Sequence, residues 1–246
     1  MDRLIYTAAS GAKHILEQQA TTSNNLANVN TTGFRAQLDV FRAVPVQSEG
    51  LPTRAFVVNS TAAADFTPGA LQITGRELDV AVKGEGWLAV QMPDGTEAYT
   101  RNGSLQTSQN GLLTTAGGAT IAGEGGPITI PPDVTVTVGG DGTISTISTT
   151  DQPAASNILG RLKLVNPPAQ DLVRGDDGLF RLKDGGTAQA DPLVSVAGGA
   201  LEGSNVSAVD SMVSMISLAR SFETQMSLLK NAENNAAKAT QILALN

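Results

Sequence analysis

The chain has 246 residues and a formal net charge of -7, with 16 Lys and Arg against 23 Asp and Glu, one histidine and no cysteine. We expect no nucleic-acid partner, because binding phosphates takes a basic patch and the sequence has no basic run, and the absence of cysteine excludes disulfides and thiolate metal sites. The first residues lack the apolar run of a secretory signal peptide, and no stretch approaches the roughly 18 apolar residues of a membrane span, so we expect no cleaved signal and no insertion into a lipid bilayer.

Helix-breaking residues divide the chain. All 11 prolines lie between Pro45 and Pro192, and 25 of the 26 glycines lie between Gly33 and Gly203. The two ends are therefore free to form long helices, while the middle is rich in turns. We expect four segments: an N-terminal helix at 1–33, an extended connecting segment at 34–75, a β-rich domain at 76–200 and a C-terminal helix at 201–246.

The N-terminal segment has the pattern of a helix that packs on another helix. Small, apolar or weakly polar residues recur at alternating spacings of three and four, which gives the period of about 3.5 residues of a stripe that faces a partner helix. The stripe comprises Ile5, Ala8, Ala12, Ile15, Gln19, Thr22, Leu26 and Val29.

The stretch "ANVNTTGF" is expected to end this helix. Asn and Thr side chains hydrogen-bond to nearby backbone and compete with the helix, and Gly33 can take the positive φ of a helix C-cap. We expect a hinge motif that turns the chain from a helical layer into a β layer, formed by Asn28, Asn30, Thr32, Gly33 and Phe34. The return is expected at "LEGSNVSAVD", where Ser204 or Asn205 would be the N-cap of the C-terminal helix.

The middle of the chain is expected to be β structure. The stretch "LDVAVKGEGWLAVQM" alternates or runs apolar around Gly84 and Gly86, and Asn-Gly turns follow at Asn102 and Asn110. The stretch "ITIPPDVTVTVGGDGTIST" alternates Thr and Val before a glycine-rich turn. Because only 4% of the residues are aromatic, the core must consist of Val, Ile and Leu.

The C-terminal segment repeats the heptad pattern for five heptads. A helix of about 38 residues spans roughly 57 Å, longer than an ordinary domain can cover, so it needs partners along its length. We therefore expect an α+β fold class, with paired N- and C-terminal coiled-coil-like helices plus a central all-β domain rich in turns. The C-terminal stripe comprises Ala208, Met212, Met215, Ala219, Phe222, Met226, Leu229, Glu233, Ala236, Thr240 and Leu243.

Several short motifs could indicate a ligand, but each has a simpler interpretation. The stretch "GEGWLA" at 84–89 leads into a strand, whereas a dinucleotide fingerprint opens a helix, and the RGD tripeptide at 174–176 lies in ordinary turn chemistry. His14 is the only histidine, so histidine triads and multi-histidine metal sites are unavailable. We expect no catalytic residue, no cofactor and no metal site.

Four motifs resemble those of the axial proteins of the bacterial flagellum, the family that includes the basal-body rod proteins. In chain order they are "SNNLANVNTTGFRAQ", "LDVAVKGEGWLAV", "YTRNGSLQTSQNGLLTTAGG" and "LEGSNVSAVDSMVSMISLARSFETQ". The length and the start "MDRLIYTAASGA" are most similar to members from the proximal rod, and the distal rod or another axial position is the alternative.

The resemblance implies a structural subunit and not an enzyme. Its partners would be copies of itself and other flagellar rod proteins, in a helical tube that transmits torque and from which the β domain faces outward. It also implies export through the flagellar type III apparatus, without a cleaved signal peptide, to the periplasmic rod of the basal body. The assembly interface would consist of the apolar stripe residues Ile5, Ala8, Ala12, Ile15, Leu26, Val29, Met212, Met215, Ala219, Phe222, Met226 and Leu229, and Ser204 and Asn205 would complete the hinge motif.

Two other classes of function stay open from the residues alone. A glycan hydrolase that opens the cell wall would need two positioned carboxylates. A monomeric surface adhesin would use the RGD turn and would have ordered ends.

Overall fold

The structure is a computed structural model that describes residues 2–45, 55–148 and 156–244. The chain forms two compact units. The helical unit consists of Met1–Val29, Ala36–Asp65 and Val206–Asn246, and the β unit consists of Asn30–Arg35 and Phe66–Asn205. Each unit is therefore assembled from segments that lie far apart in the sequence.

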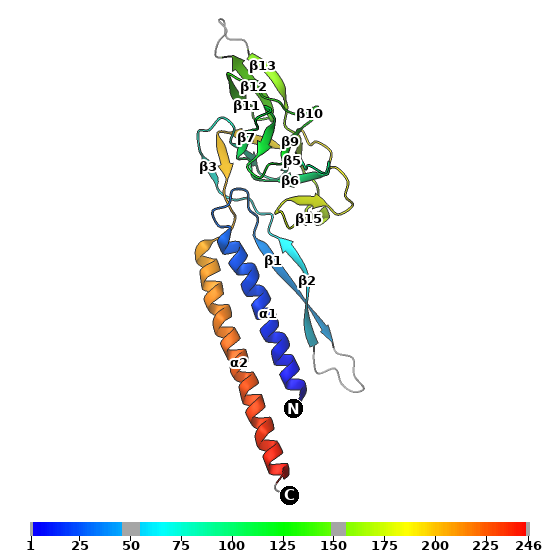
Figure 1. Cartoon of the computed structure of the whole chain (residues 1–246), viewed down its shortest axis with the longest axis vertical. Coiled ribbons are helices and arrows are strands. Elements are labelled where there is room, and N and C mark those ends of the chain that lie inside the picture. Colours follow the sequence, from blue (N-terminus) through cyan, green and yellow to red (C-terminus); the bar gives the residue numbers. More distant parts are fainter. Residues whose placement is uncertain (1, 46–54, 149–155, 245–246) are drawn as a thin grey trace. The chain divides into compact units, whose positions relative to one another are not determined.

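In the helical unit, two long helices run side by side in opposite directions, and a β-hairpin lies along the first of them (Figure 1). The elements are α1 (Asp2–Ala27), β1 (Gln37–Pro45), β2 (Ala55–Ala64) and α2 (Ala208–Ala244). The two strands are antiparallel, with a bulge between Val40 and Phe41. Helix α1 contacts both the hairpin and α2, so it forms the middle layer of this unit.

Side chains of α1 hold the hairpin in place. The amide of Asn25 donates to the Gln37 carbonyl at 2.9 Å and accepts from the Gln37 N–H at 2.8 Å, so one side chain satisfies both backbone groups at the start of β1. The ring of His14 packs edge-on against Phe41, with 5.6 Å between the ring centroids. His14 is therefore a packing residue of this contact.

Side-chain hydrogen bonds cap the last turn of α1 and the first turn of α2. At the end of α1, the Asn28 amide donates to the Asn24 carbonyl at 2.9 Å, which satisfies a carbonyl of the last turn. At the start of α2, the Ser207 hydroxyl accepts the Asp210 N–H at 3.3 Å, the contact of an N-cap. The expected N-cap at Ser204 or Asn205 was wrong, because this part of the chain is held by the β unit: the Asn205 amide donates to the Thr67 carbonyl at 3.0 Å.

The expected fold class was wrong in two respects. β structure is not confined to the central domain, because β1 and β2 belong to the helical unit. The helices also depart from the expected coiled coil, because Met212 and Met226 of the C-terminal stripe are 53% and 47% exposed. The half-buried row on α2 is instead Ala208, Ser211, Met215, Leu218, Phe222, Gln225, Leu229 and Ala232.

The physical reason is that α2 carries two neighbouring rows of apolar residues. The periodicity of the sequence shows that such rows exist but not which of them faces α1. Among the described residues, the α-helices are the two near the ends of the chain, and the region between them is rich in β structure.

The β unit consists of short strands joined by tight turns (Figure 1). The elements are β3 (Leu71–Ile73), β4 (Val80–Lys83), β5 (Trp87–Gln91), β6 (Glu97–Thr100), β7 (Leu105–Thr107), β8 (Leu113–Thr115), β9 (Thr120–Gly123), β10 (Gly126–Pro127), β11 (Val134–Val138), β12 (Thr143–Ser148), β13 (Ser156–Arg161), β14 (Leu164–Val165), η1 (Ala169–Asp171, a 3-10 turn), β15 (Leu172–Arg174), β16 (Phe180–Leu182), β17 (Ser195–Gly198) and β18 (Ala200–Glu202).

One large sheet dominates the β unit. Its strands follow the order β15-β16-β6-β5-β9-β8-β7, with β10 beside β9 and β14 beside β5. Strands β11, β12 and β13 form a second sheet, and two further pairs join β17 with β4 and β18 with β3.

The core of the β unit is aliphatic, as the composition predicted. Its fully buried residues include Val80, Leu88, Val90, Leu113 and Ile144. Strands β4 and β5 carry three and four consecutive buried side chains, the pattern of strands that are covered on both faces. The aromatic residues near β5 and β16 lie outside this cluster, at the site described next.

Candidate functional site

Residues from several of the motifs noted in the sequence lie close together at one place in the β unit. The "NTTGFR" stretch brings Arg35, the start of β5 brings Trp87, the turn after β6 brings Arg101, and the end of β18 brings Glu202. All four side chains are buried. We call these four residues the motif junction.

The carboxylate of Glu202 is the centre of the motif junction. Its Oε1 atom accepts hydrogen bonds from Arg35 Nη2 at 2.6 Å and from the Gly69 N–H at 2.8 Å, and its Oε2 atom accepts one from Arg101 Nη1 at 2.9 Å. The three charged side chains are at most 3% exposed. Because buried charges lose their hydration, such a cluster is stable only while every partner is present.

Both arginines also face the ring of Trp87. The guanidinium carbon of Arg101 lies 5.4 Å from the ring centroid and that of Arg35 lies 6.0 Å from it, within the range of cation–π attraction. Arg101 also donates to the Gly84 carbonyl at 2.6 Å. Burial lowers the pKa of Arg101, and the adjacent Glu202 carboxylate opposes that shift. The guanidinium stays protonated, so the motif junction holds two cations and one anion.

An aromatic layer extends the motif junction. Trp87 packs on Phe180 with 4.7 Å between the ring centroids. Arg174 lies over Phe34 at 4.5 Å and donates to the Arg35 carbonyl at 2.9 Å, and burial lowers its pKa. Arg174 is the arginine of the RGD tripeptide, so that side chain is bound within the β unit instead of projecting as an adhesion motif would.

The hinge motif docks into the β unit. Gly33 has φ +68°, the left-handed conformation expected for it, but it lies six residues beyond the end of α1 and is not a helix C-cap. Its N–H donates to the Glu202 carbonyl at 2.8 Å, and a Cβ there would lie 2.3 Å from the carbonyl carbon of Arg101. Glycine is required because two backbones approach each other closely.

Thr32 and Phe34 of the hinge motif also contact the β unit. Thr32 Oγ1 donates to the Asn102 side chain at 2.8 Å, and Phe34 is buried beneath Arg174. Asn30 is exposed, and Ser204 and Asn205 are half-buried.

The residues of the predicted assembly interface lie on more than one face of the helical unit. On α1, Ala8 and Ala12 are buried, and the half-buried ones are Ile15, Leu26 and, just beyond the helix, Val29. On α2, half-buried are Met215, Phe222 and Leu229, and exposed are Met212, Ala219 and Met226. The side chain of Ile5 lies outside the described residues.

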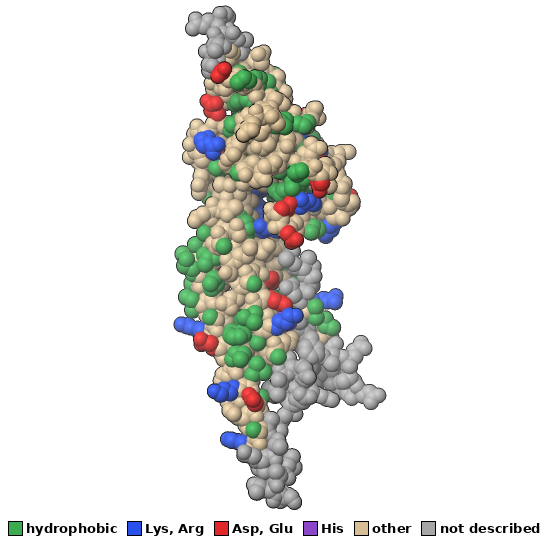
Figure 2. Space-filling view, in the orientation of Figure 1, with side chains coloured by type: hydrophobic (Ala, Val, Ile, Leu, Met, Phe, Trp, Pro, Cys, Tyr) green, Lys and Arg blue, Asp and Glu red, His purple; other side chains and the backbone are tan. Residues whose placement is uncertain are grey.

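Helix α2 carries an exposed apolar face. Hydrophobic side chains gather over α2 in Figure 2, and four of them follow the spacing i, i+3, i+4, i+7 of one helix face. They are Val209, Met212, Val213 and Ile216, which are 70%, 53%, 60% and 56% exposed. We call these four residues the α2 face. The heptad pattern identified only Met212 among them, because it selects a single row.

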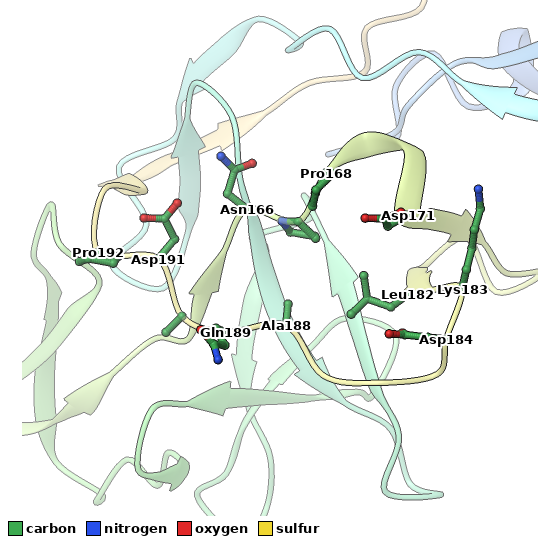
Figure 3. A pocket seen from close by; sticks show the side chains of 12 residues that line it. Asn166, Pro168, Asp171, Leu182, Lys183, Asp184, Ala188, Gln189, Asp191 and Pro192 are labelled. Atoms are coloured by element: carbon green, nitrogen blue, oxygen red, sulfur yellow. The ribbon is translucent and has the colours of Figure 1, made fainter.

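A pocket of about 600 Å³ lies among the loops around η1 and β16 (Figure 3). Two of its carboxylates form turns: Asp184 accepts the Gly186 N–H and Asp191 accepts the Leu193 N–H. Asp171 and Asp191 lie toward opposite ends of the pocket in Figure 3. Asp184 and Asp191 therefore serve to shape the loops of the pocket. Within the described ranges, no three His, Cys, Asp or Glu side chains gather in a group that could hold a metal ion.

Three family models match the chain in order. The model "Flagella basal body rod protein" matches residues 5–35, the model "Flagellar hook protein FlgE/F/G D1 domain" matches residues 81–146, and the model "Flagellar basal body rod FlgEFG protein C-terminal" matches residues 197–242. Together the matches contain all four residues of the motif junction and most of α2.

Full-length relatives agree with these models. The flagellar basal-body rod protein FlgF of Escherichia coli K12 is 49% identical and that of Salmonella typhimurium LT2 is 48% identical, each over 100% of both chains. A basal-body rod protein FlgG of Buchnera aphidicola from Schizaphis graminum is 31% identical over 89% of this chain and 92% of its own. The chain therefore belongs to the flagellar basal-body rod protein family and is of the FlgF type.

Proposed function

We propose that this chain, a structural subunit of the proximal rod of the flagellar basal body, is held in the rod by its helical unit and passes torque to its neighbours through packed helices. The observation that carries the proposal is the α2 face, whose four apolar side chains are each more than half exposed. An exposed apolar row on a long helix is typical of a surface that packs against another protein.

Burial of the α2 face against a partner would contribute a substantial free energy. Full burial of a Val, Ile or Met side chain is worth about 1.5–3 kcal/mol, and about 60% of each of the four side chains is exposed. Covering the α2 face is then worth roughly 4–7 kcal/mol per subunit before the cost of association. Repeated in every copy, such contacts would give a stiff tube.

The partners in this proposal are copies of the chain and other rod proteins in a helical assembly. The shielded interface residues, such as Ala12 and Phe222, would hold α1 and α2 together within a subunit. The exposed ones, Met212 and Met226, would contact neighbouring subunits. The β unit would be the outward-facing part.

The motif junction suits a subunit that carries mechanical load. It ties the stretch that follows α1 to the stretch that precedes α2 through Arg35 and Glu202. We propose that this buried ionic contact keeps these two stretches joined to each other within the β unit.

We further propose that the chain reaches the periplasmic rod through the flagellar type III export apparatus, without a cleaved signal peptide and without entering the lipid bilayer. No helix in the described ranges is long and apolar enough to cross a membrane. The rod relatives support this location.

The proposed role does not include catalysis. A glycan hydrolase is disfavoured because Asp184 and Asp191 of the pocket are engaged in turns. An adhesin is disfavoured by the intramolecular contacts of Arg174. Incubating the purified chain with peptidoglycan tests the first alternative directly, and release of soluble glycan would support it.

The experiment that tests the proposal replaces Ile216 by Asp in cells that carry no other copy of the protein. A carboxylate within a buried apolar contact is costly, so we expect loss of swimming while the β unit stays folded. The matched control is Ser214→Asp, an exposed polar position outside the α2 face on the same helix. Normal swimming of the Ile216 variant, at a normal level of exported protein, would refute the proposal.

A further inference from the structure

The hairpin of the helical unit carries a second exposed apolar surface. Phe41 faces α1, where it packs on His14, and neighbouring positions of a strand face the other way. Leu38 and Val40 of β1 are 48% and 45% exposed, and Val58 of β2 is 46% exposed. Arg42, also exposed, is paired with Val58 across the hairpin and so lies on the same face. We call Leu38, Val40, Arg42 and Val58 the hairpin face.

The two exposed faces lie on different layers of one unit. Helix α1 stands between α2 and the hairpin and contacts both (Figure 1). The α2 face and the hairpin face are therefore different surfaces of one subunit, and they cannot cover each other within that subunit.

The symmetry of the assembly limits which surface of another copy can cover the α2 face and the hairpin face. If the α2 face packed on another α2 face, the contact would close as a dimer and leave both hairpin faces exposed. If it packs on the hairpin face of the next copy, one repeated contact covers both surfaces and continues without closing, which builds rings or helical tubes.

We infer that the α2 face of one copy docks on the hairpin face of the adjacent copy. The inference rests on the proposed function, because it names the surface that receives the α2 face. Leu38, Val40 and Val58 would pack against Val209, Met212, Val213 and Ile216 of the neighbour.

Charge and length are consistent with this pairing. Glu223 follows Ile216 by seven residues, so this exposed acid continues the row of the α2 face, and it would meet Arg42 at the edge of the hairpin face. Arg220 follows Ile216 by four residues, so this exposed cation also lies beside the row, next to Glu223. From Val209 to Ile216 the α2 face is about 10 Å long, and from Leu38 to Arg42 the hairpin face is about 13 Å long.

The contact is small. The hairpin face offers three half-exposed apolar side chains and the α2 face offers four. A stable complex has roughly 20–30 interface residues on each side. The docking should therefore form in the assembled rod, where many contacts act together, and not between dilute free chains.

Disulfide trapping tests the inference, since the chain has no native cysteine. Val40→Cys and Met212→Cys are expressed together as the only copies in flagellated cells, and the rods are oxidised and run on a non-reducing gel. We expect a covalent dimer when both variants are present and little from either alone. Leu16→Cys with Met212→Cys is the matched control, because Leu16 is 50% exposed on α1 but outside both faces.

Charge reversal gives a second readout with the same cysteines. Arg42→Glu and Glu223→Arg should each lower the yield of the dimer at least about fivefold, and the two together should restore it. A dimer from Met212→Cys alone would instead show that the α2 face packs on itself. Equal trapping of Leu16→Cys, or no trapping in assembled rods, would overturn the inference. The proposed function has its own test: it is refuted if cells that carry Ile216→Asp swim normally, whatever the result of the disulfide trapping.

Discussion

Replacing Gly33 by Ala should destabilise the β unit far more than the same change at another left-handed glycine. Gly33 has φ +68° and Gly185 has φ +70°, so both alanines incur the left-handed backbone strain of about 1–2 kcal/mol. The surroundings differ. At Gly185 an added Cβ meets nothing within 4 Å, whereas at Gly33 it would lie 2.3 Å from the Arg101 carbonyl carbon and 2.4 Å from the Asn102 nitrogen.

The backbone atoms around Gly33 cannot rotate away, so one segment has to move. Forcing packed structure apart costs about 1–3 kcal/mol, which brings the expected loss for Gly33→Ala to roughly 2–5 kcal/mol. A shift would also lengthen the bond from the Gly33 N–H to the Glu202 carbonyl, now 2.8 Å. The β unit should then lose a substantial part of the about 5–15 kcal/mol that is typical of a folded protein.

Urea unfolding of the purified full chain measures this loss. Trp87 is the only tryptophan and lies against Arg35 and Arg101, so its fluorescence reports on the motif junction. The midpoint for Gly33→Ala should fall well below that for Gly185→Ala, with the slope unchanged. If the two variants lose the same free energy of unfolding within about 0.5 kcal/mol, the close approach of the two backbones at Gly33 does not constrain the fold.

Three further changes test other parts of the structure. Glu202→Gln removes the anion between two buried arginines and should cost about 3–5 kcal/mol by Trp87 fluorescence; a loss below about 1 kcal/mol would mean that the arginines do not need it. Ser207→Ala removes the N-cap of α2 and should weaken its first turn by about 1 kcal/mol, seen as faster hydrogen exchange there, while Ser204→Ala should not. Burial raises the pKa of Tyr99 to about 12, above the ordinary value near 10. The folded state therefore holds this proton more tightly, so the stabilisation is complete below pH about 10 and is lost between about 10 and 12. Tyrosinate absorbance of a Tyr6→Phe variant would follow it, and titration near 10 would contradict the burial.

The sequence predicted the helices better than the way they pack. Heptad spacing located α1 and α2, but α2 has Leu218 beside Ala219 and Val213 beside Met212, so two rows fit the period about equally well. Only the position of α1 selects the row that contains Leu218, and that position is a property of the tertiary fold. The α2 face differs from the half-buried row only in its exposure in the folded structure.

The hairpin lies within residues 34–75, which the sequence predicts to be an extended connecting segment, although the first strand carries a strand-like pattern. In "QLDVFRAV", Asp39 lies between Leu38 and Val40, and Arg42 follows Phe41. This is strand alternation interrupted by the bulge between Val40 and Phe41. The bulge moves Phe41 to the side of His14 and breaks the period of two. A pattern search for strict alternation passes over such a strand.

The motif junction could be predicted only in part. Gly33 was identified because a turn after Asn and Thr residues favours positive φ. The ion pairs could not be predicted, because Arg35, Arg101 and Glu202 lie far apart in the sequence and nothing in the local sequence indicates that they are buried. Charged residues are rarely fully buried without partners, so their burial is evident only once the partners are seen together.

In the rod, the helical unit of this chain should be covered by neighbouring subunits. The most direct test is the reaction rate of a single cysteine at Met212 with a thiol reagent, in the purified chain and in isolated basal bodies, with Gln106→Cys, exposed on β7, as the reference. We predict that Met212→Cys reacts quickly in the free chain and is strongly protected in basal bodies, while Gln106→Cys reacts at similar rates in both. Equal reactivity of Met212→Cys in the free chain and in basal bodies would contradict the claim.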